Sequence, residues 1–312
     1  MQAELGGLTN GPGHDNSRYV LQGQIDDLQG KLSGLNEIQA RLDTNPGLPE
    51  DRRYYLLGID STGDGKAIVA TGNPDTAQNV ATFVPGTGTD LATIGSTLDR
   101  SDVMHRAADK TGAGPNSVIS WLGYDAPDSV HNAAMSGYAE DARKPLDSFQ
   151  DGLRESHIGA PSRNTVIGHS YGSTAAGFAA RDEQLAVDAF VAVGSPGVGV
   201  DDATGLHLPP EQVWAVAAAN DPVADLQRFG NAPTDPDFGA NKIDASPRYA
   251  VAGGRVQPAG AQRILGSPHP VTGCDGAGHR RAESQLGNRE HAQLQAGHHR
   301  LLPGPRRLRW RR

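Results

Sequence analysis

The sequence has one cysteine, few aromatic residues and no long apolar run. Cys274 stands alone, so it cannot form a disulfide within the chain, and a cysteine-based metal cluster is excluded. No window approaches the roughly 18 consecutive apolar residues that favour a membrane-spanning helix. The first residues lack the basic and apolar regions of a cleavable signal peptide. We therefore expect no integral membrane segment and a cytoplasmic location, with signal-less export as the alternative.

Lysine is absent from the last part of the chain. Residues 245–312 contain twelve arginines, three acidic residues and no lysine, so this tail has a charge of about +9 within a chain of net charge −8. Its Arg, Gly, Pro, His and Gln content predicts disorder rather than a packed core. The basic end, Pro305–Arg312, suggests nucleic-acid binding on charge alone. A disordered basic end is the ordinary explanation, and we expect no nucleic-acid partner.

The remaining sequence predicts two regions before that tail. Residues 1–50 are expected to form a helical segment and linker, and residues 51–244 a globular domain. Leucines recur every seven residues, with apolar residues between them, at Leu21, Ile25, Leu28, Leu32, Leu35 and Leu42. This pattern predicts an amphipathic helix over residues 19–42. We expect it to pack on the main domain, because three heptads are marginal alone; a separate helical partner is the alternative.

Strand and helix patterns alternate through the main domain. Apolar runs predict a hairpin at 54–59 and 67–71, then strands at 80–84 and 117–122, a strand in the apolar run that begins at Val166, and strands at 187–193 and 213–218. Helical patterns lie at 91–108, within 131–156 and after residue 170. Such alternation predicts an α/β fold with a mainly parallel sheet and helices on both faces. Ligands in these sheets bind beyond the carboxyl ends of the strands.

The most informative motif is Gly-His-Ser-Tyr-Gly at 168–172, between an apolar run and a small-residue helix. It predicts a nucleophile elbow, in which a sharp turn presents the Ser170 hydroxyl and the two glycines relieve crowding. One oxyanion donor is expected to be the backbone N–H of Tyr171. The second is expected to be the N–H of Thr87, in the Gly-rich loop 84–90.

Two rival interpretations of Gly-rich loops fail on the residues present. The loop 84–90 does not complete a Gly-x-Gly-x-x-Gly dinucleotide pattern, because residue 91 is Leu. The Asp60–Gly65 turn resembles a calcium loop, but its twelfth position is Thr71 rather than a bidentate Glu. We therefore expect neither a cofactor nor a metal.

A serine nucleophile also needs an acid and a base. Asp221, in Asn-Asp-Pro after a strand, is the predicted acid because it follows the serine in chain order; Asp201 and Asp202 are fallback candidates. We expect His169 and His207 to have structural roles or to be exposed. The base should follow the acid, and chain order alone offers only residues of the tail, namely His269, His279, His291, His298 and His299.

The motifs at 84–89, 168–173, 194–197 and 220–222 together resemble an actinobacterial α/β-hydrolase family of unknown function, over about residues 53–239. The resemblance implies an α/β-hydrolase-like sheet with Ser170 as nucleophile and Asp221 as acid. Members continue with a His-Ser-x-Tyr-Trp segment, which this chain lacks. One hypothesis is that the tail is translated in a shifted reading frame, so that the base and the end of the sheet are missing; the gene's other frames test it.

The sequence therefore predicts a serine hydrolase that cleaves an ester or related acyl bond of a small molecule through an acyl-enzyme. The alternative is an inactive protein of the same fold that serves as a binding or structural module.

Overall fold

In the computed structural model of the chain, the described residues are 15–218, 221, 223 and 227–245, with the backbone of two short strands beyond them. The main sheet has eight strands: β1 (Tyr54–Asp60), β2 (Lys66–Thr71), β3 (Asn79–Val84), β4 (Asn116–Leu122), β5 (Arg163–His169), β6 (Ala189–Val193), β7 (Val213–Val216) and β8 (Asn241–Lys242). Their order across the sheet is β1-β2-β4-β3-β5-β6-β7-β8.

The sheet is mainly parallel, as the sequence predicts. Strand β2 pairs antiparallel with both β1 and β4, whereas every other neighbouring pair is parallel. The carboxyl ends of β3 to β8 therefore lie along one edge of the sheet. The short strand β8 pairs with β7 at Trp214 and Ala215 and precedes the tail, so it does not test the hypothesis that a shifted frame removes the end of the sheet.

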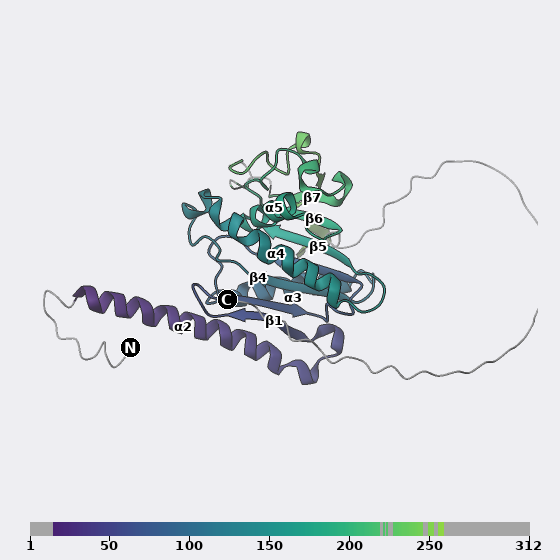
Figure 1. The fold of residues 1–312 in the computed structure, drawn as a ribbon. Coiled ribbons are helices and arrows are strands. Elements are labelled where there is room, and N and C mark those ends of the chain that lie inside the picture. Colours follow the sequence, from purple (N-terminus) through teal and green to yellow (C-terminus); the bar gives the residue numbers. More distant parts are fainter. Residues whose placement is uncertain are drawn as a thin grey trace, which may run out of the picture. The chain divides into compact units, whose positions relative to one another are not determined.

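Four α-helices accompany the sheet in the described part of the chain: α2 (Asp15–Asp43), α3 (Ile94–Asp109), α4 (Gly137–Ser156) and α5 (Tyr171–Glu183). Short 3-10 helices occupy 45–47, 50–52, 132–134, 203–206, 210–212 and 236–238. Helices α4 and α5 pack side by side over one face (Figure 1). Helix α3 packs on the other face, so the predicted two-sided cover is confirmed.

The central strands are buried on both faces, which explains their nearly continuous apolar runs. In β3, Val84 belongs to the core beneath α4 and α5, whereas Ala81 and Phe83 belong to the core beneath α3. Strand β5 divides in the same way, with Val166 on the first side and Ile167 on the second. This alternation holds β5 rigidly in the centre of the sheet, where it positions the residues that follow it.

Helix α2 packs against the main domain through its second half. Ile38 is buried, and Leu35 and Leu42 are packed with it against α3 and β2. The helix approaches closely at Gly34, where a Cβ would lie 1.7 Å from the Leu91 carbonyl oxygen. The expected packing on the main domain is therefore confirmed.

The heptad pattern does not form one continuous buried seam on α2. Ile25 is buried, but Leu28 and Leu32 are 50% and 57% exposed. The heptad spacing alone did not distinguish these leucines from Leu35 and Leu42, because the burial of each position depends on the surface that it faces and not on the period.

Two strands, β9 (Tyr249–Ala252) and β10 (Arg255–Pro258), pair antiparallel within the predicted tail. Cys274, the five candidate histidines of the tail and the basic segment 305–312 lie outside the described residues. Among the helices that the structure does describe, none combines the length and the apolar character that crossing a membrane requires.

Candidate active site at the carboxyl edge of the sheet

Ser170 occupies the turn between the central strand and the helix that follows it. Strand β5 ends at His169 and α5 begins at Tyr171, which leaves Ser170 as the single connecting residue. Its backbone has φ 52° and ψ −128°, a region that residues with a side chain rarely adopt. The Ser170 N–H donates to the Val193 carbonyl oxygen at 2.8 Å. The residue is partly exposed at the carboxyl edge of the sheet.

The two glycines that flank this turn lie where no side chain fits. A Cβ on Gly168 would lie 2.3 Å from the Ser173 Cα, and one on Gly172 would lie 2.2 Å from the Val84 carbonyl oxygen. Both distances are far below van der Waals contact. The predicted use of the glycines to relieve crowding is therefore confirmed, and it allows α5 to begin directly against the end of β3.

The Gly-rich loop after β3 lies against the same turn. A Cβ on Gly86 would lie 2.9 Å from the Ser170 Cβ and 3.0 Å from the Tyr171 backbone nitrogen. Thr87 follows directly and is partly exposed. The structure therefore brings the loop of one predicted oxyanion donor beside the residue that supplies the other.

A buried tyrosine that the sequence analysis missed holds this loop. The Tyr124 hydroxyl donates to the Pro85 carbonyl oxygen at 2.7 Å, and burial raises the pKa of Tyr124 above its ordinary value. The raised pKa keeps the hydroxyl protonated, so it remains a donor. No local sequence signal marked Tyr124, because its partner is 39 positions away in the chain.

Asp221 reaches the end of the strand next to Ser170. One carboxylate oxygen, Oδ2, lies 2.8 Å from the position that a Cβ on Gly194 would occupy, and Gly194 directly follows β6. The other oxygen, Oδ1, accepts the Val223 N–H at 3.0 Å. The carboxylate therefore lies at the carboxyl edge, while one of its oxygens closes a local turn.

The two fallback acids are placed differently. Asp202 is exposed and caps a short 3-10 helix by accepting hydrogen bonds from the Thr204 N–H and hydroxyl. These bonds, with the Thr204 side chain first, lower the pKa of Asp202. Asp201 is also exposed. Both fit the expected alternative of ordinary surface carboxylates.

The histidines of the described residues do not complete a triad. None of them is hydrogen-bonded to Ser170 or Asp221. The His207 Nε2 pairs with the Arg181 carbonyl oxygen at 3.0 Å, and the residue is exposed, as expected. The His169 ring packs near Phe83, with ring centroids 6.4 Å apart, which agrees with the expected structural role.

The pKa of His169 yields a pH prediction. Burial, and then Arg100, lower its pKa from the ordinary 6.5, against a smaller opposite effect of Asp221. Burial favours the neutral imidazole in the folded protein, so the unfolded chain binds a proton more readily as the pH falls. The contribution of His169 to the free energy of unfolding is therefore present above pH 6.5 and is lost as the pH falls below it. We expect His169→Gln to weaken the loss of stability between about pH 7.5 and pH 5, in which ordinary histidines titrate.

Urea unfolding midpoints at both pH values measure this effect. His207→Gln is the matched control, because it makes the same substitution at an exposed histidine. An identical pH dependence in the wild type and His169→Gln would contradict the assignment.

Negative charge gathers at the same edge, on the side of β1 to β4. Burial and then the neighbouring Asp128, Asp125 and Asp90 raise the pKa of Asp64. Lys66 offsets part of this charge through an ion pair with Asp125 at 2.9 Å. The Asp60 carboxylate closes a turn by accepting from Thr62. Over the residues that the structure covers, no group of three or more His, Cys, Asp or Glu side chains is arranged to hold a metal ion.

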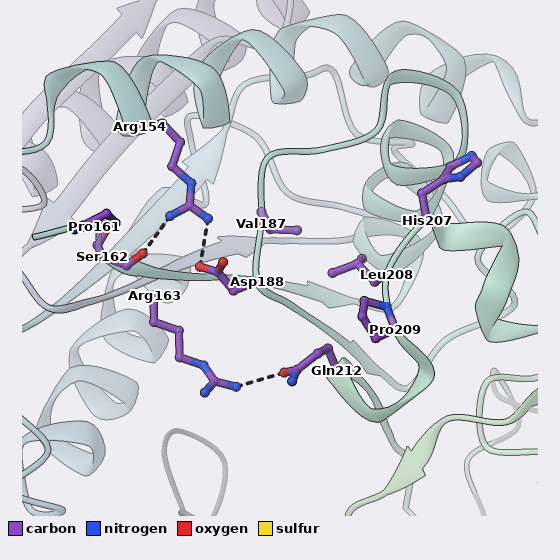
Figure 2. Close-up of a pocket in the computed structure, with 10 residues that line it drawn as sticks. All are labelled: Arg154, Pro161, Ser162, Arg163, Val187, Asp188, His207, Leu208, Pro209 and Gln212. Carbon is purple, nitrogen blue, oxygen red and sulfur yellow. Dashed lines mark hydrogen bonds and ion pairs between the residues drawn. The ribbon is translucent and has the colours of Figure 1, made fainter.

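A cavity of about 590 Å³ lies elsewhere, beside the first residues of β5, β6 and β7 (Figure 2). Its Arg154 guanidinium bonds the Ser162 carbonyl oxygen at 2.7 Å and Asp188 at 2.8 Å. Arg163 donates to Gln212 at 3.1 Å. These pairs connect neighbouring loops. The cavity lies at the amino end of β5, whereas Ser170 follows its carboxyl end, so the two are separate features.

Comparison with known families settles the class of protein. A sequence model described as alpha/beta hydrolase matches residues 60–231, which is more than half of the chain. The chain belongs to this alpha/beta hydrolase family. The hydrolase fold accordingly accounts for the mainly parallel sheet and for the strand–turn–helix unit around Ser170.

Relatives of the chain occur in mycobacteria. The uncharacterized protein Rv2079 of Mycobacterium tuberculosis is 33% identical over 201 residues, which is 59% of this chain but 31% of that protein. The chain thus spans less than a third of the first relative's length. The uncharacterized protein Rv0963c of the same species is 30% identical over 220 residues, covering 66% of this chain and 80% of that protein.

Two solved structures show a distant likeness. The esterase LipW from Mycobacterium marinum has 14% identity and a TM-score of 0.40, covering 69% of this chain and 78% of that one. An arylesterase has 16% identity and a TM-score of 0.41, covering 66% of this chain and 81% of that one.

Proposed function

We propose that this hydrolase cleaves an ester or related acyl bond of a small molecule, with Ser170 as the nucleophile. The observation that carries the proposal is the geometry of the turn. Ser170 is partly exposed at φ 52° between β5 and α5, with the Gly86 loop against it. A strained turn at a sheet edge is where such folds present a nucleophile.

The proposed reaction follows from the residues at this edge. The Ser170 oxygen attacks the acyl carbon, and the backbone N–H groups of Tyr171 and Thr87 stabilise the oxyanion. A base takes the Ser170 proton and gives it to the alcohol, which leaves as the ester C–O bond breaks. Water then loses a proton to the same base and attacks the acyl carbon, and the carboxylic acid is released as the Ser170 oxygen regains its proton. Asp221 is the proposed acid that orients the base. The carboxylates around Asp64 disfavour an anionic substrate, so we propose a neutral ester.

The candidate bases of the tail lie outside the described residues, and a second candidate function applies if none of them reaches Ser170. Without an imidazole beside Ser170, the protein would be a binding or structural module with a hydrolase fold. Removing one member of a triad lowers the rate by several orders of magnitude, so the two candidates differ in a measurable way.

A fluorophosphonate probe distinguishes them. In the labelling reaction the Ser170 oxygen bonds phosphorus, fluoride leaves and the hydroxyl proton passes to a base. We expect the full chain to be labelled, with the modification mapped by mass spectrometry to the peptide that contains Ser170. Heat-denatured protein is the control for nonspecific reaction. No labelling of the folded protein, or labelling at another residue, would support the inactive module instead.

A further inference from the structure

One segment at the carboxyl edge is attached to the oxyanion loop, to Tyr171 and to Arg228. Residues 127–139, here called the 127–139 segment, lead from the loop after β4 into the first turn of α4. The Gly88 N–H, in the oxyanion loop, donates to the Pro127 carbonyl oxygen at 2.8 Å. Arg228, which follows Asp221 in the chain, donates through Nε to the Ala134 carbonyl oxygen at 3.0 Å.

The third attachment is made by Tyr171, the residue directly after Ser170. Its hydroxyl donates to the Met135 carbonyl oxygen at 2.5 Å and accepts the Ala139 N–H at 3.2 Å. Burial is the main cause that raises the pKa of Tyr171, to about 12. The hydroxyl therefore keeps its proton and remains a donor at neutral pH.

The Tyr171 ring is also held from two sides. It meets the rings of Tyr138 and Phe229 edge-on, with centroids 6.3 Å and 5.7 Å apart. The residue is 1% exposed. A side chain fixed at its ring and at its hydroxyl leaves the backbone of the same residue little freedom to rotate.

We infer that Tyr171 is a positioning residue whose hydroxyl couples the 127–139 segment to the backbone N–H that faces the oxyanion. The inference rests on the proposed function, because that N–H is the proposed oxyanion donor. An oxyanion donor is effective only when its direction is fixed before the reaction, since reorganisation would otherwise add to the barrier. The hydroxyl supplies this fixation through contacts 36 and 32 positions away in the chain.

Inactivation kinetics with a fluorophosphonate test the inference through Tyr171→Phe. This change removes one oxygen and keeps the ring, so the fold is retained. We expect the maximal inactivation rate constant to fall about tenfold, in line with the loss of a hydrogen-bonded restraint, while the half-saturating probe concentration and the final labelled fraction stay unchanged. A purely structural role would lower the labelled fraction and not the rate constant. An unchanged rate constant would overturn the inference.

Tyr138→Phe is the matched control, since Tyr138 packs against the same ring, and it should match the wild type. Hydrogen exchange gives a second result that does not depend on Ser170 reactivity. We expect amides at 135–139 and 171–175 to exchange about tenfold faster in Tyr171→Phe alone. If the wild type is not labelled, the proposed function fails and exchange alone decides the coupling. Unchanged hydrogen exchange at 135–139 and 171–175 in Tyr171→Phe would refute the coupling.

Discussion

Ser170→Ala is expected to abolish fluorophosphonate labelling and to lower any esterase activity by a factor on the order of 10⁴ or more. The reason is that the Ser170 side chain is the proposed nucleophile, and alanine removes its hydroxyl while keeping the Cβ at the β5–α5 turn. Hydrolysis of a neutral short-chain nitrophenyl ester measures the effect. Activity that persists in Ser170→Ala would place the reaction elsewhere and contradict the assignment.

The same position should show a trade-off between activity and stability. Ser170 has φ 52° and ψ −128°. An alanine at this position would keep the same strained backbone angles, whereas a glycine adopts them freely. We expect Ser170→Gly to be more stable than Ser170→Ala by about 1 kcal/mol, after allowance for the greater entropy of glycine in the unfolded chain. Urea unfolding midpoints compare the two inactive variants. A less stable glycine variant would show that the turn is not strained.

Gly172→Ala is expected to be the most destabilising small substitution near the site. A Cβ there would lie 2.2 Å from the Val84 carbonyl oxygen and 2.4 Å from the Pro85 carbonyl oxygen. Both atoms are backbone, so the first turn of α5 or the oxyanion loop must move. We expect a loss of about 3 kcal/mol in the free energy of unfolding, the upper part of the range for overpacking. Labelling of Ser170 should slow as well, because the loop carries a proposed oxyanion donor.

Gly152→Ala provides the comparison for Gly172→Ala. Gly152 lies inside α4 with no atom within 4 Å of the added Cβ, so its substitution tests the helix propensity of alanine alone. We expect a gain of up to about 1 kcal/mol there. Denaturant unfolding of both variants separates the two effects. Equal stability changes at the two positions would show that the contact at Gly172 relaxes without cost.

Much of the fold was predictable because its signals are local. The hairpin, the alternating strands and helices, and the helix over residues 19–42 follow from runs and periods of apolar residues. The element around Ser170 was predictable for the same reason, since Gly168 and Gly172 are needed within the turn itself. The placement of Asp221 depended only on chain order and on the parallel sheet, which brings strand ends to one edge.

Other features could not be predicted in this way. The heptad pattern treats Leu28 and Leu35 alike, yet only Leu35 meets the domain. The roles of Tyr124 and Arg228 had no sequence signal, because each bonds a backbone carbonyl group far away in the chain. Any tyrosine or arginine in a loop has the same local appearance.

The sequence by itself determined the class of fold and the presentation of one serine at a turn, because spacing, apolar runs and obligatory glycines act over a few neighbouring residues. Only the tertiary structure decided what surrounds that serine. The hydroxyls of Tyr124 and Tyr171 reach carbonyl groups 39 and 36 positions away, and such pairings exist only after the chain has folded. The tertiary structure also distinguished Leu35 and Leu42 from Leu28 and Leu32 on α2, since burial depends on the neighbouring surface and not on the period of the helix.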